Sequence, residues 1–337
     1  MTSASSLTSA SSLTWVIGRG GLLGQSVESA IGASMDHMGG SDLWQPAEPI
    51  PWTAPTAGAP ELRAQAEQFL RAAGERPWSV AWCAGAGVMG TSEKTLDLEL
   101  VALRETLAAL GTAPQVNRGA FFLASSAGGV YAGVGMPPYD ESSPVRALAP
   151  YGRAKLDAEA MVSDWSRRTG TPSLIGRISN LYGPGQNLAK PQGLISQICR
   201  SHLTGQPLSI YVSLDTLRDY LFAPDCAGLV VAGLARLRHE QAARGPSVVT
   251  KIFASQRAIT IGAVLGEMRR LFKSSPRIVL GASVVASVQA KDLSLRSRVW
   301  PELDRRSLTP FPVGVAATAA DLLRRLQAGA IEGVRHR

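Results

Sequence analysis

The sequence predicts an α/β protein with a doubly wound parallel sheet and a smaller C-terminal lobe. Three observations predict it. Apolar runs of strand length alternate with amphipathic stretches of helix length, a glycine-rich turn directly follows the first run, and polar motifs stand where apolar runs end. Because such sheets bind ligands at the carboxyl ends of their strands, we expect the functional residues to gather along one edge of the sheet.

The chain alternates strand and helix patterns from its first apolar run. The run T-W-V-I-G begins at Thr14 and leads through the glycine turn 18–21 into a helical stretch over 22–31. A short second strand is expected around 42–45, within a Pro-rich segment of weak periodicity. Apolar residues then return at helical spacing over 61–73.

The elements that follow have stronger patterns. W-S-V-A-W-C-A-G at 78–85 is a buried-strand run that ends in small residues, and A-F-F-L-A-S-S at 120–126 is another that ends in hydroxyls. Amphipathic helices are expected over 92–111 and 150–169, and a further strand over 173–179. Repeated strand and helix units of this kind favour a parallel sheet.

After Leu181 the alternation becomes irregular. We expect helices near 191–204, 224–238 and 260–273 and shorter strands near 208–213, 247–254 and 276–280. This mixed pattern predicts a lobe that covers the substrate, with part of the region 216–254 returning to the main sheet.

The composition excludes several functional classes. The net charge is +8, but lysine and arginine are scattered, which favours an anionic small substrate over nucleic acid. The three cysteines, Cys83, Cys199 and Cys226, are far apart and form neither a disulfide framework nor a C-x-x-C metal site, so a cytoplasmic protein without a metal is expected. The sequence contains no run of about 18 apolar residues, so no membrane helix is predicted.

The glycine turn predicts a dinucleotide-binding site. Its glycines Gly18, Gly21 and Gly24 follow a strand and open a helix, where backbone amides can approach a pyrophosphate, as in a Rossmann fold. The predicted cofactor-binding residues of this turn are Gly18, Arg19, Gly20, Gly21, Leu22, Leu23 and Gly24. No acid or base is clearly placed at the end of the second strand, so NAD and NADP both remain, with a preference for NAD because no arginine follows that strand.

The predicted organisation follows from this turn and from the change of pattern after Leu181. We expect a flexible tail over 1–13, in which T-S-A-S-S-L occurs twice, a dinucleotide-binding domain over 14–180, and mainly a substrate-binding lobe over 181–330.

The residues that we expect to transfer protons stand in one block, P-Y-G-R-A-K at 150–155. Tyr151 and Lys155 are four residues apart and therefore share one helical face, and Pro150 suits the first turn of that helix. An ammonium beside a phenol stabilises the phenolate, which can take a proton from an alcohol while hydride leaves the carbon. Ser126, at the end of its strand, could hydrogen-bond the reacting oxygen.

Six blocks together resemble the NAD-dependent epimerase/dehydratase family, the extended short-chain dehydrogenases that act on nucleotide sugars. They are G-R-G-G-L-L-G at 18–24, A-W-C-A-G-A at 81–86, A-S-S-A-G-G-V-Y at 124–131, P-Y-G-R-A-K at 150–155, G-R-I-S-N-L-Y-G-P-G-Q at 176–186 and L-R-D-Y-L-F at 217–222. The blocks span 14–225 in the family's order, and a looser similarity continues to about 321.

The resemblance implies a role for each matching residue. Ser126, Tyr151 and Lys155 would be the catalytic set, and Tyr151 and Lys155 would also contact the cofactor. Ala84 and Gly85 would line the adenosine side of the cofactor. Asn180 and Arg218 would bind the nucleotide-sugar substrate, Arg218 through its diphosphate. A homodimer formed through the helices around 92–111 and 150–169 is also implied.

Two departures from the family pattern bear on the reaction. Dehydratases of the family usually follow the catalytic hydroxyl with an acidic pair, whereas Ala127-Gly128-Gly129 follow Ser126 here, which disfavours dehydration. An extra glycine before Tyr131 leaves open whether Ser125 or Ser126 presents its hydroxyl.

The predicted activity is epimerisation of a nucleotide sugar through a transient keto-sugar. The alternatives are a reductase that consumes NAD(P)H to reduce a ketosugar, using the same residues, and a dinucleotide-binding scaffold or sensor that has lost catalysis.

Overall fold

The computed structural model describes residues 11–34, 41–52, 55–85, 87–88, 90–189, 192–245, 247–281 and 290–331. The strands are β1 (Ser12–Ile17), β2 (Ser41–Trp44), β3 (Trp78–Trp82), β4 (Gly119–Ser126), β5 (Ser173–Ile178), β6 (Asn180–Tyr182), β7 (Leu208–Ile210), β8 (Leu217–Arg218), β9 (Tyr220–Phe222), β10 (Val248–Phe253), β11 (Ile259–Thr260), β12 (Ile278–Leu280) and β13 (Asp292–Leu293).

The helices of the described chain lie between these strands. They are α1 (Leu22–Ser34), α2 (Pro55–Ala73), α3 (Glu93–Gly111), α4 (Ala127–Tyr131), α5 (Pro150–Thr169), α6 (Leu194–Thr204), α7 (Ala223–Arg244), α8 (Ile261–Phe272), α9 (Pro301–Asp304) and α10 (Phe311–Gln327), with one 3₁₀ turn (Val116–Arg118) before β4.

The main sheet has six strands in the order β10-β5-β4-β3-β1-β2, and every pairing in it is parallel. The chain starts near one edge, winds outward through β1 and β2, and then returns to build the other half from β3 onward. The doubly wound parallel sheet expected from the sequence is therefore confirmed. Its carboxyl edge brings together the segments that follow β1, β3, β4 and β5.

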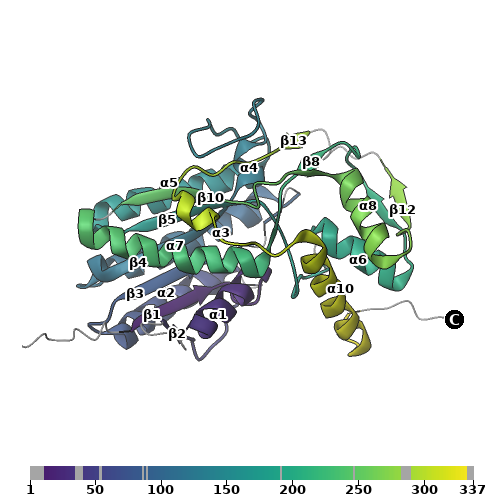
Figure 1. Ribbon diagram of the computed structural model, residues 1–337. Coiled ribbons are helices and arrows are strands. Elements are labelled where there is room, and N and C mark those ends of the chain that lie inside the picture. The colour runs from purple at the N-terminus through teal and green to yellow at the C-terminus, as the bar shows by residue number, and fades with distance from the viewer. Residues whose placement is uncertain are drawn as a thin grey trace, which may run out of the picture.

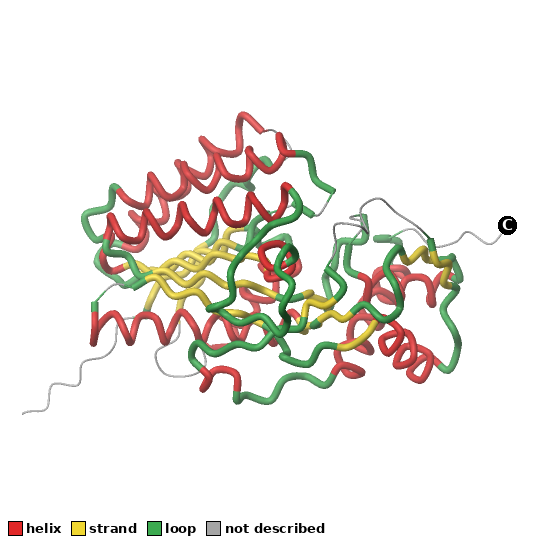
Figure 2. Tube along the Cα trace, turned by 90° about the horizontal axis from the view of Figure 1, so that it is seen from above, coloured by secondary structure: helices red, strands yellow, loops and turns green. Residues whose placement is uncertain are grey.

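Helices cover both faces of this sheet, as Figures 1 and 2 show. On one face α2, α3 and α5 pack over a core that includes the buried rings of Trp15, Phe69, Trp78 and Trp165. On the other face α1 packs beside α7, and the second core includes Phe122. Two apolar layers explain why the central strands are buried throughout instead of alternating.

Local signals set the boundaries of the helices near the site. Ser92 caps α3 by accepting a hydrogen bond from the Thr95 amide, so that α3 begins at Glu93. Pro150 is the first residue of α5, and Gly170 ends that helix with a left-handed φ of 71°. The expected helices over 92–111 and 150–169 are confirmed nearly to the residue.

The predicted end of the flexible tail, at residue 13, is wrong. β1 begins at Ser12, two residues before the expected start at Thr14. Ser12 and Leu13 are buried and pair with β2, where the Ser12 hydroxyl donates to the Ser41 Oγ at 2.9 Å. A serine can extend a buried strand when a hydroxyl on the neighbouring strand accepts its hydrogen bond. The rest of the expected tail, residues 1–10, lies outside the described residues.

The later half of the chain is shared between the sheet and a lobe. β10 pairs with β5 at the edge of the main sheet, and α7 packs on its face, so much of the range 216–254 belongs to the main layer. The lobe contains α6, α8 and α10 with the short strands β7 and β12, and it has its own apolar core. It lies to one side of the main sheet (Figure 1).

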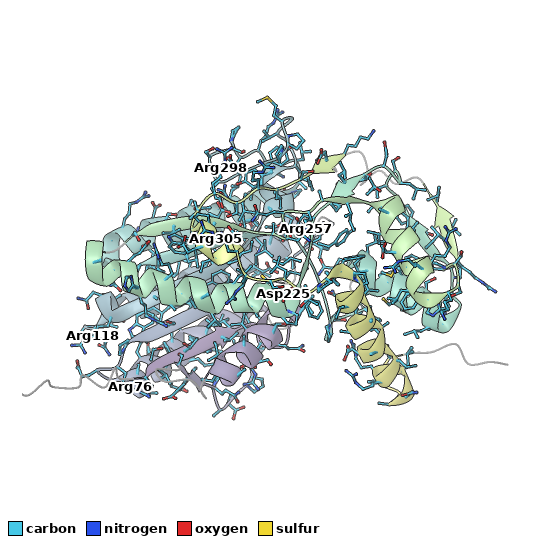
Figure 3. The ribbon with its side chains drawn as sticks, viewed as in Figure 1. Arg76, Arg118, Asp225, Arg257, Arg298 and Arg305 are labelled. Carbon is cyan, nitrogen blue, oxygen red and sulfur yellow. The ribbon has the colours of Figure 1, made fainter. Side chains whose placement is uncertain are left out.

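A few polar contacts fasten the lobe to the main domain. Asp225, in the first turn of α7, accepts hydrogen bonds from the backbone N–H and the hydroxyl of Thr309, just before α10 (Figure 3). Asp321 on α10 accepts from the amide of Gly185, which follows β6. Among the described helices, none is both long and apolar enough to span a bilayer.

Candidate active site

The glycine turn after β1 is shaped by two glycines that no larger residue could replace without movement. Gly18 has a φ of +90°, and a β-carbon on it would lie 2.5 Å from the Ala84 amide nitrogen. A β-carbon on Gly24 would lie 2.2 Å from the Gly18 carbonyl oxygen. The first strand, the start of α1 and the end of β3 therefore meet at backbone distance.

The remaining residues of the turn leave its outer side open. A β-carbon on Gly20 would meet no heavy atom within 4 Å. The Gly20 carbonyl oxygen accepts a hydrogen bond from the Gln25 side chain at 2.9 Å, and the amide of Gly21 donates to Gly18 at 2.9 Å. The open turn at the N-terminus of α1 fits the pyrophosphate of a dinucleotide, which would bind to backbone amides and the positive end of the helix.

Tyr151 and Lys155 lie on one face of α5, as their spacing predicted. The Lys155 ammonium is 5.8 Å from the centroid of the Tyr151 ring and donates a hydrogen bond to the carbonyl oxygen of Ala124 at 3.2 Å. Ala124 belongs to β4, so this bond ties the ammonium to the end of the central strand. Both side chains are half-buried and line one cavity.

Ser126 and Tyr151 are brought together by a contact between α4 and α5. Ser126 caps α4 by accepting a hydrogen bond from the Gly129 amide at 3.2 Å. A β-carbon on Gly129 would lie 3.4 Å from the Ser126 Cβ and 3.2 Å from the Tyr151 Cε1. The hydroxyl and the phenol therefore flank the same glycine.

Ser125 has a different environment. Its hydroxyl donates to the Glu159 carboxylate at 2.6 Å, and this carboxylate also forms a buried ion pair with Arg177 at 2.7 Å. Arg177 also donates to the Tyr131 hydroxyl at 2.8 Å. Burial alone would lower the pKa of Arg177, but hydrogen bonding and the charge of Glu159 outweigh it and raise that pKa. Ser125 is thus part of a buried network beneath the site, whereas Ser126 is only half-buried.

The segment after β3 forms the opposite wall. Ala84 is buried against Gly18, and Gly85 has a φ of +143°. A β-carbon on Gly85 would lie 3.4 Å from the Lys155 ammonium. Of the two residues expected to line the adenosine side of a cofactor, Gly85 therefore lies beside Lys155.

One acidic residue of this wall cannot be identified from the sequence. Glu99 on α3 accepts a hydrogen bond from the Gly87 amide at 2.9 Å and lines the same cavity as Tyr151 and Lys155. Its position on an amphipathic helix carries no local signal, because charged residues are ordinary on such helices. Only the packing of α3 beside α5 brings this carboxylate to the site.

The two predicted substrate-binding residues occupy different places. Asn180 is exposed and lines a small cavity with Ser179 and Asp219. The side chain of Arg218 is buried, and it donates hydrogen bonds to the carbonyl oxygens of Leu217 and Lys291. Burial lowers the pKa of Arg218 from its ordinary value. Asn180 thus lines a cavity, while Arg218 is held among backbone carbonyls.

Asp219 organises the loop opposite Asn180. Its carboxylate accepts hydrogen bonds from the amides of Ser255 and Arg257 at 2.8 and 3.1 Å, and from the Ser255 hydroxyl at 2.8 Å. This holds the turn after β10, in which Gln256 has a φ of +58°. Arg257 projects from this turn between the main domain and the lobe (Figure 3).

The chemical groups of the site suit proton and hydride transfer. The phenol of Tyr151 and the ammonium of Lys155 line one cavity, and Ser126 lies on the other side of Gly129 from Tyr151. The helix that follows Ser126, α4, carries no acid. Within the described residues, no group of three or more His, Cys, Asp or Glu side chains is arranged to hold a metal ion.

Comparison with protein families identifies a family model that matches more than half of the chain. The model of the NAD dependent epimerase/dehydratase family matches residues 63–245. Similar curated proteins include dTDP-glucose 4,6-dehydratase of Neisseria gonorrhoeae, 35% identical over 89 residues (26% of this chain and 25% of the relative), and dTDP-L-rhamnose 4-epimerase of Burkholderia thailandensis, 34% identical over 102 residues (30% and 28%). The chain matches these curated relatives over about a quarter of their length.

Solved structures match nearly the whole chain in fold. The UDP-glucose 4-epimerase of Thermotoga maritima, solved with UDP-glucose, has a TM-score of 0.75 at 16% identity and covers 93% of this chain and 99% of its own. MoeE5, solved with UDP-glucuronic acid and NAD, has a TM-score of 0.73 at 19% identity, with 94% and 100% covered. At these identities the likeness shows the fold.

Proposed function

Because the chain belongs to the NAD dependent epimerase/dehydratase family, we propose that it is an epimerase of a nucleotide sugar that works by transient oxidation to a keto-sugar and re-reduction. The observation that carries the proposal is the grouping of Tyr151, Lys155 and Ser126 around Gly129 and the end of β4. The glycine turn 18–24 supports NAD as the cofactor, and structural neighbours such as MoeE5 are described in complex with NAD.

Each residue has a defined task in this reaction. Tyr151 takes the proton from the sugar hydroxyl and returns it after reduction. Lys155 places its ammonium beside the phenol and stabilises the phenolate that forms. Ser126 donates a hydrogen bond to the reacting oxygen and so favours the charge that develops there. A bound nicotinamide would supply the acceptor and donor of hydride.

The absence of an acid on α4 favours epimerisation over dehydration. Loss of water from a sugar needs an acid to protonate the departing hydroxyl and a base to remove a neighbouring proton. In this chain Ala127, Gly128 and Gly129 follow Ser126 and can do neither. Glu99 lies beside Tyr151 but approaches from α3 and already accepts a hydrogen bond from Gly87.

Incubation with nucleotide sugars in the absence of added cofactor tests the proposal. Purified protein is mixed with UDP-glucose, UDP-glucuronic acid and dTDP-glucose, and the products are followed by proton NMR. Epimer formation with the retained dinucleotide supports the proposal, because the cofactor is regenerated in each cycle. A deoxy-keto product would show a dehydratase, and turnover only with added NAD(P)H would show the reductase alternative.

The oligomeric state belongs to the same proposal. α3 and α5 pack side by side on one face of the sheet, and Val101 on α3 is 38% exposed. We expect these two helices to pair with their copies in a homodimer. Light scattering after size-exclusion chromatography measures this, and a Val101→Glu substitution should favour the monomer.

A further inference from the structure

The small cavity that Asn180 lines lies at the carboxyl edge of the main sheet, next to Ser126. Its wall contains Gly128, two residues after Ser126, and Ser179, the residue that follows β5. Ile178 is the partner of Ser126 in the pairing of β4 with β5, and neighbouring strands lie about 4.8 Å apart. The cavity therefore begins where Ser126 ends its strand.

One side of this cavity is polar and the other is apolar. Ser179, Asn180 and Asp219 bring a hydroxyl, an amide and a carboxylate to its wall. Leu293 and Leu295, both largely buried, bring apolar side chains. A pyranose ring is divided in the same way, since its hydroxyls lie around the edge and its C–H groups cover the faces. The lining therefore suits part of a sugar, with a hydroxyl turned toward the polar side.

Ser179 carries a buried hydroxyl in this wall. Its Oγ atom has no hydrogen-bond partner among the described residues, although its backbone amide donates to the Phe253 carbonyl oxygen at 2.9 Å. The Asp219 carboxylate differs, because it accepts from the amides of Ser255 and Arg257. A buried hydroxyl that makes no hydrogen bond costs free energy, and a ligand that bonds to it recovers that cost. Ser179 thus offers a group that a ligand can satisfy.

We propose that Ser179 is a substrate-binding residue whose hydroxyl bonds to a sugar hydroxyl other than the one that reacts. The inference rests on the proposed function, because it requires a nucleotide sugar with its reacting oxygen at Ser126. A serine hydroxyl can both donate and accept, so it pairs with a sugar hydroxyl in either sense. A sugar without that hydroxyl leaves Ser179 unpartnered and is disfavoured. Ser179 would therefore contribute to the choice of sugar.

Calorimetric titration measures what the sugar adds to the affinity. The ligands are UDP and UDP-glucose, and dTDP and dTDP-glucose, and each pair gives a ratio of nucleotide-sugar affinity to nucleoside-diphosphate affinity. In Ser179→Ala this ratio should fall by about 3- to 10-fold for the nucleotide that the protein binds, the size expected for one hydrogen bond between neutral groups. Affinity for the nucleoside diphosphate should stay within about twofold, because that part of the ligand does not reach Ser179.

Deoxy analogues of the same nucleotide sugar identify the partner hydroxyl. Each analogue lacks one hydroxyl and is titrated into the unmodified protein and into Ser179→Ala. For one analogue the loss caused by Ser179→Ala should disappear, because the interacting pair is already broken. A loss that persisted with every analogue would show that the substitution changes the shape of the site, and it would contradict a bond to the sugar.

Stability separates this role from a structural one. Ser179→Ala should leave the ligand-free protein as stable as the unmodified protein or more stable, because the hydroxyl that is removed makes no hydrogen bond there. Chemical denaturation measures this. A clear loss of stability, or failure to fold, would show that the hydroxyl serves the fold and would overturn the inference.

Ser196→Ala is the matched control. The Ser196 hydroxyl is also buried and has no partner among the described residues, but it lies on α6 in the lobe and not in the wall of the cavity. This variant should resemble Ser179→Ala in stability and the unmodified protein in its affinity ratio. A fall of the ratio in both variants would contradict a specific role for Ser179.

The inference and the proposed function fail in different ways. An unchanged ratio in folded Ser179→Ala would show that the hydroxyl does not bind the sugar and would leave the proposed function standing. Failure of the unmodified protein to bind any of the four ligands would remove the nucleotide sugar and, with it, both proposals.

Discussion

The backbone at Gly152 presses directly against Gly129. A β-carbon on Gly152 would lie 2.1 Å from the Gly129 carbonyl oxygen, closer than any side chain can approach. The contact joins the first turn of α5 to α4 and thereby places Tyr151 beside Ser126. Glycine in the block P-Y-G-R-A-K is therefore required by the packing of two helices.

Gly152→Ala should destabilise the protein and disrupt the site. The added methyl group must displace backbone, which we expect to lower the free energy of unfolding by about 2–4 kcal/mol. Gly32→Ala is the matched control, since Gly32 is also helical but has open space around its β-carbon position. That control should be neutral or stabilising by up to about 1 kcal/mol. Chemical denaturation measures both, and equal stability of the two variants would contradict the contact.

Gly18→Ala should strongly weaken dinucleotide binding, whereas Gly20→Ala should be tolerated. At Gly18 both the φ of +90° and the 2.5 Å approach to Ala84 oppose a side chain, but Gly20 has neither constraint from the protein. We expect NAD affinity to fall more than about tenfold for Gly18→Ala in calorimetric titration. A similar loss for Gly20→Ala would mean that the cofactor itself, not the protein, fills the space at Gly20.

Tyr151→Phe should lower turnover by roughly 100- to 10,000-fold, because it removes the proton-transferring oxygen, and should weaken NAD binding much less, because the aromatic ring remains beside the cofactor. Lys155→Met should weaken NAD binding by about tenfold as well as turnover, since the ammonium is also expected to contact the cofactor. Steady-state kinetics and cofactor titration on the same preparations separate the two effects. Full activity of Tyr151→Phe would favour the non-catalytic alternative.

The neighbouring serines should differ in their effect on turnover. Ser126→Ala should reduce turnover by about 10- to 100-fold, since its hydroxyl is expected to bind the reacting oxygen, and the loss of its cap on α4 should lower the free energy of unfolding by about 1 kcal/mol. Ser125→Ala should lower the free energy of unfolding by about 1–2 kcal/mol, because it removes a buried hydrogen bond to Glu159. Kinetics and denaturation on both variants test the pair. A larger loss of turnover in Ser125→Ala would reverse the assignment.

Stability should decline in alkaline solution. Burial raises the pKa of Cys83 and of Cys199 to about 12, so these thiols stay protonated in the folded protein well above the range in which an unfolded cysteine ionises, near pH 8.5. Their contribution to stability is therefore complete below about pH 8.5 and is lost as the pH rises toward 12. Each such thiol should add up to about 1.4 kcal/mol per pH unit to the decline.

Cys199→Ala isolates one of these contributions. Unfolding free energies measured between about pH 8 and 10 should fall less steeply in this variant than in the unmodified protein. The comparison uses slopes because the lost packing lowers stability at every pH. Parallel slopes would show that the thiol ionises equally in the folded and unfolded states.

Much of this protein could be predicted from local patterns. The strand and helix order up to Ile178, the glycine turn and the Tyr151-Lys155 pair depend on periodicity and on spacings of a few residues, which the chain determines wherever it folds. Gly18 and Gly24 could be identified for the same reason, since they belong to one short glycine-rich motif. The end of the tail was misjudged because Ser12 extends a strand only when β2 lies beside it.

Only the tertiary structure decided the rest. Ser125 and Ser126 are adjacent in sequence, and the packing of Glu159 against one of them separates their roles. Glu99 lies 56 positions from Lys155 in the numbering and reaches the same cavity because α3 packs beside α5. Sequence by itself determined which chemical groups were present and which neighbours shared a helical face. The packing of whole helices decides which distant groups meet. This packing depends on many contacts between segments, so no single segment of the sequence determines it.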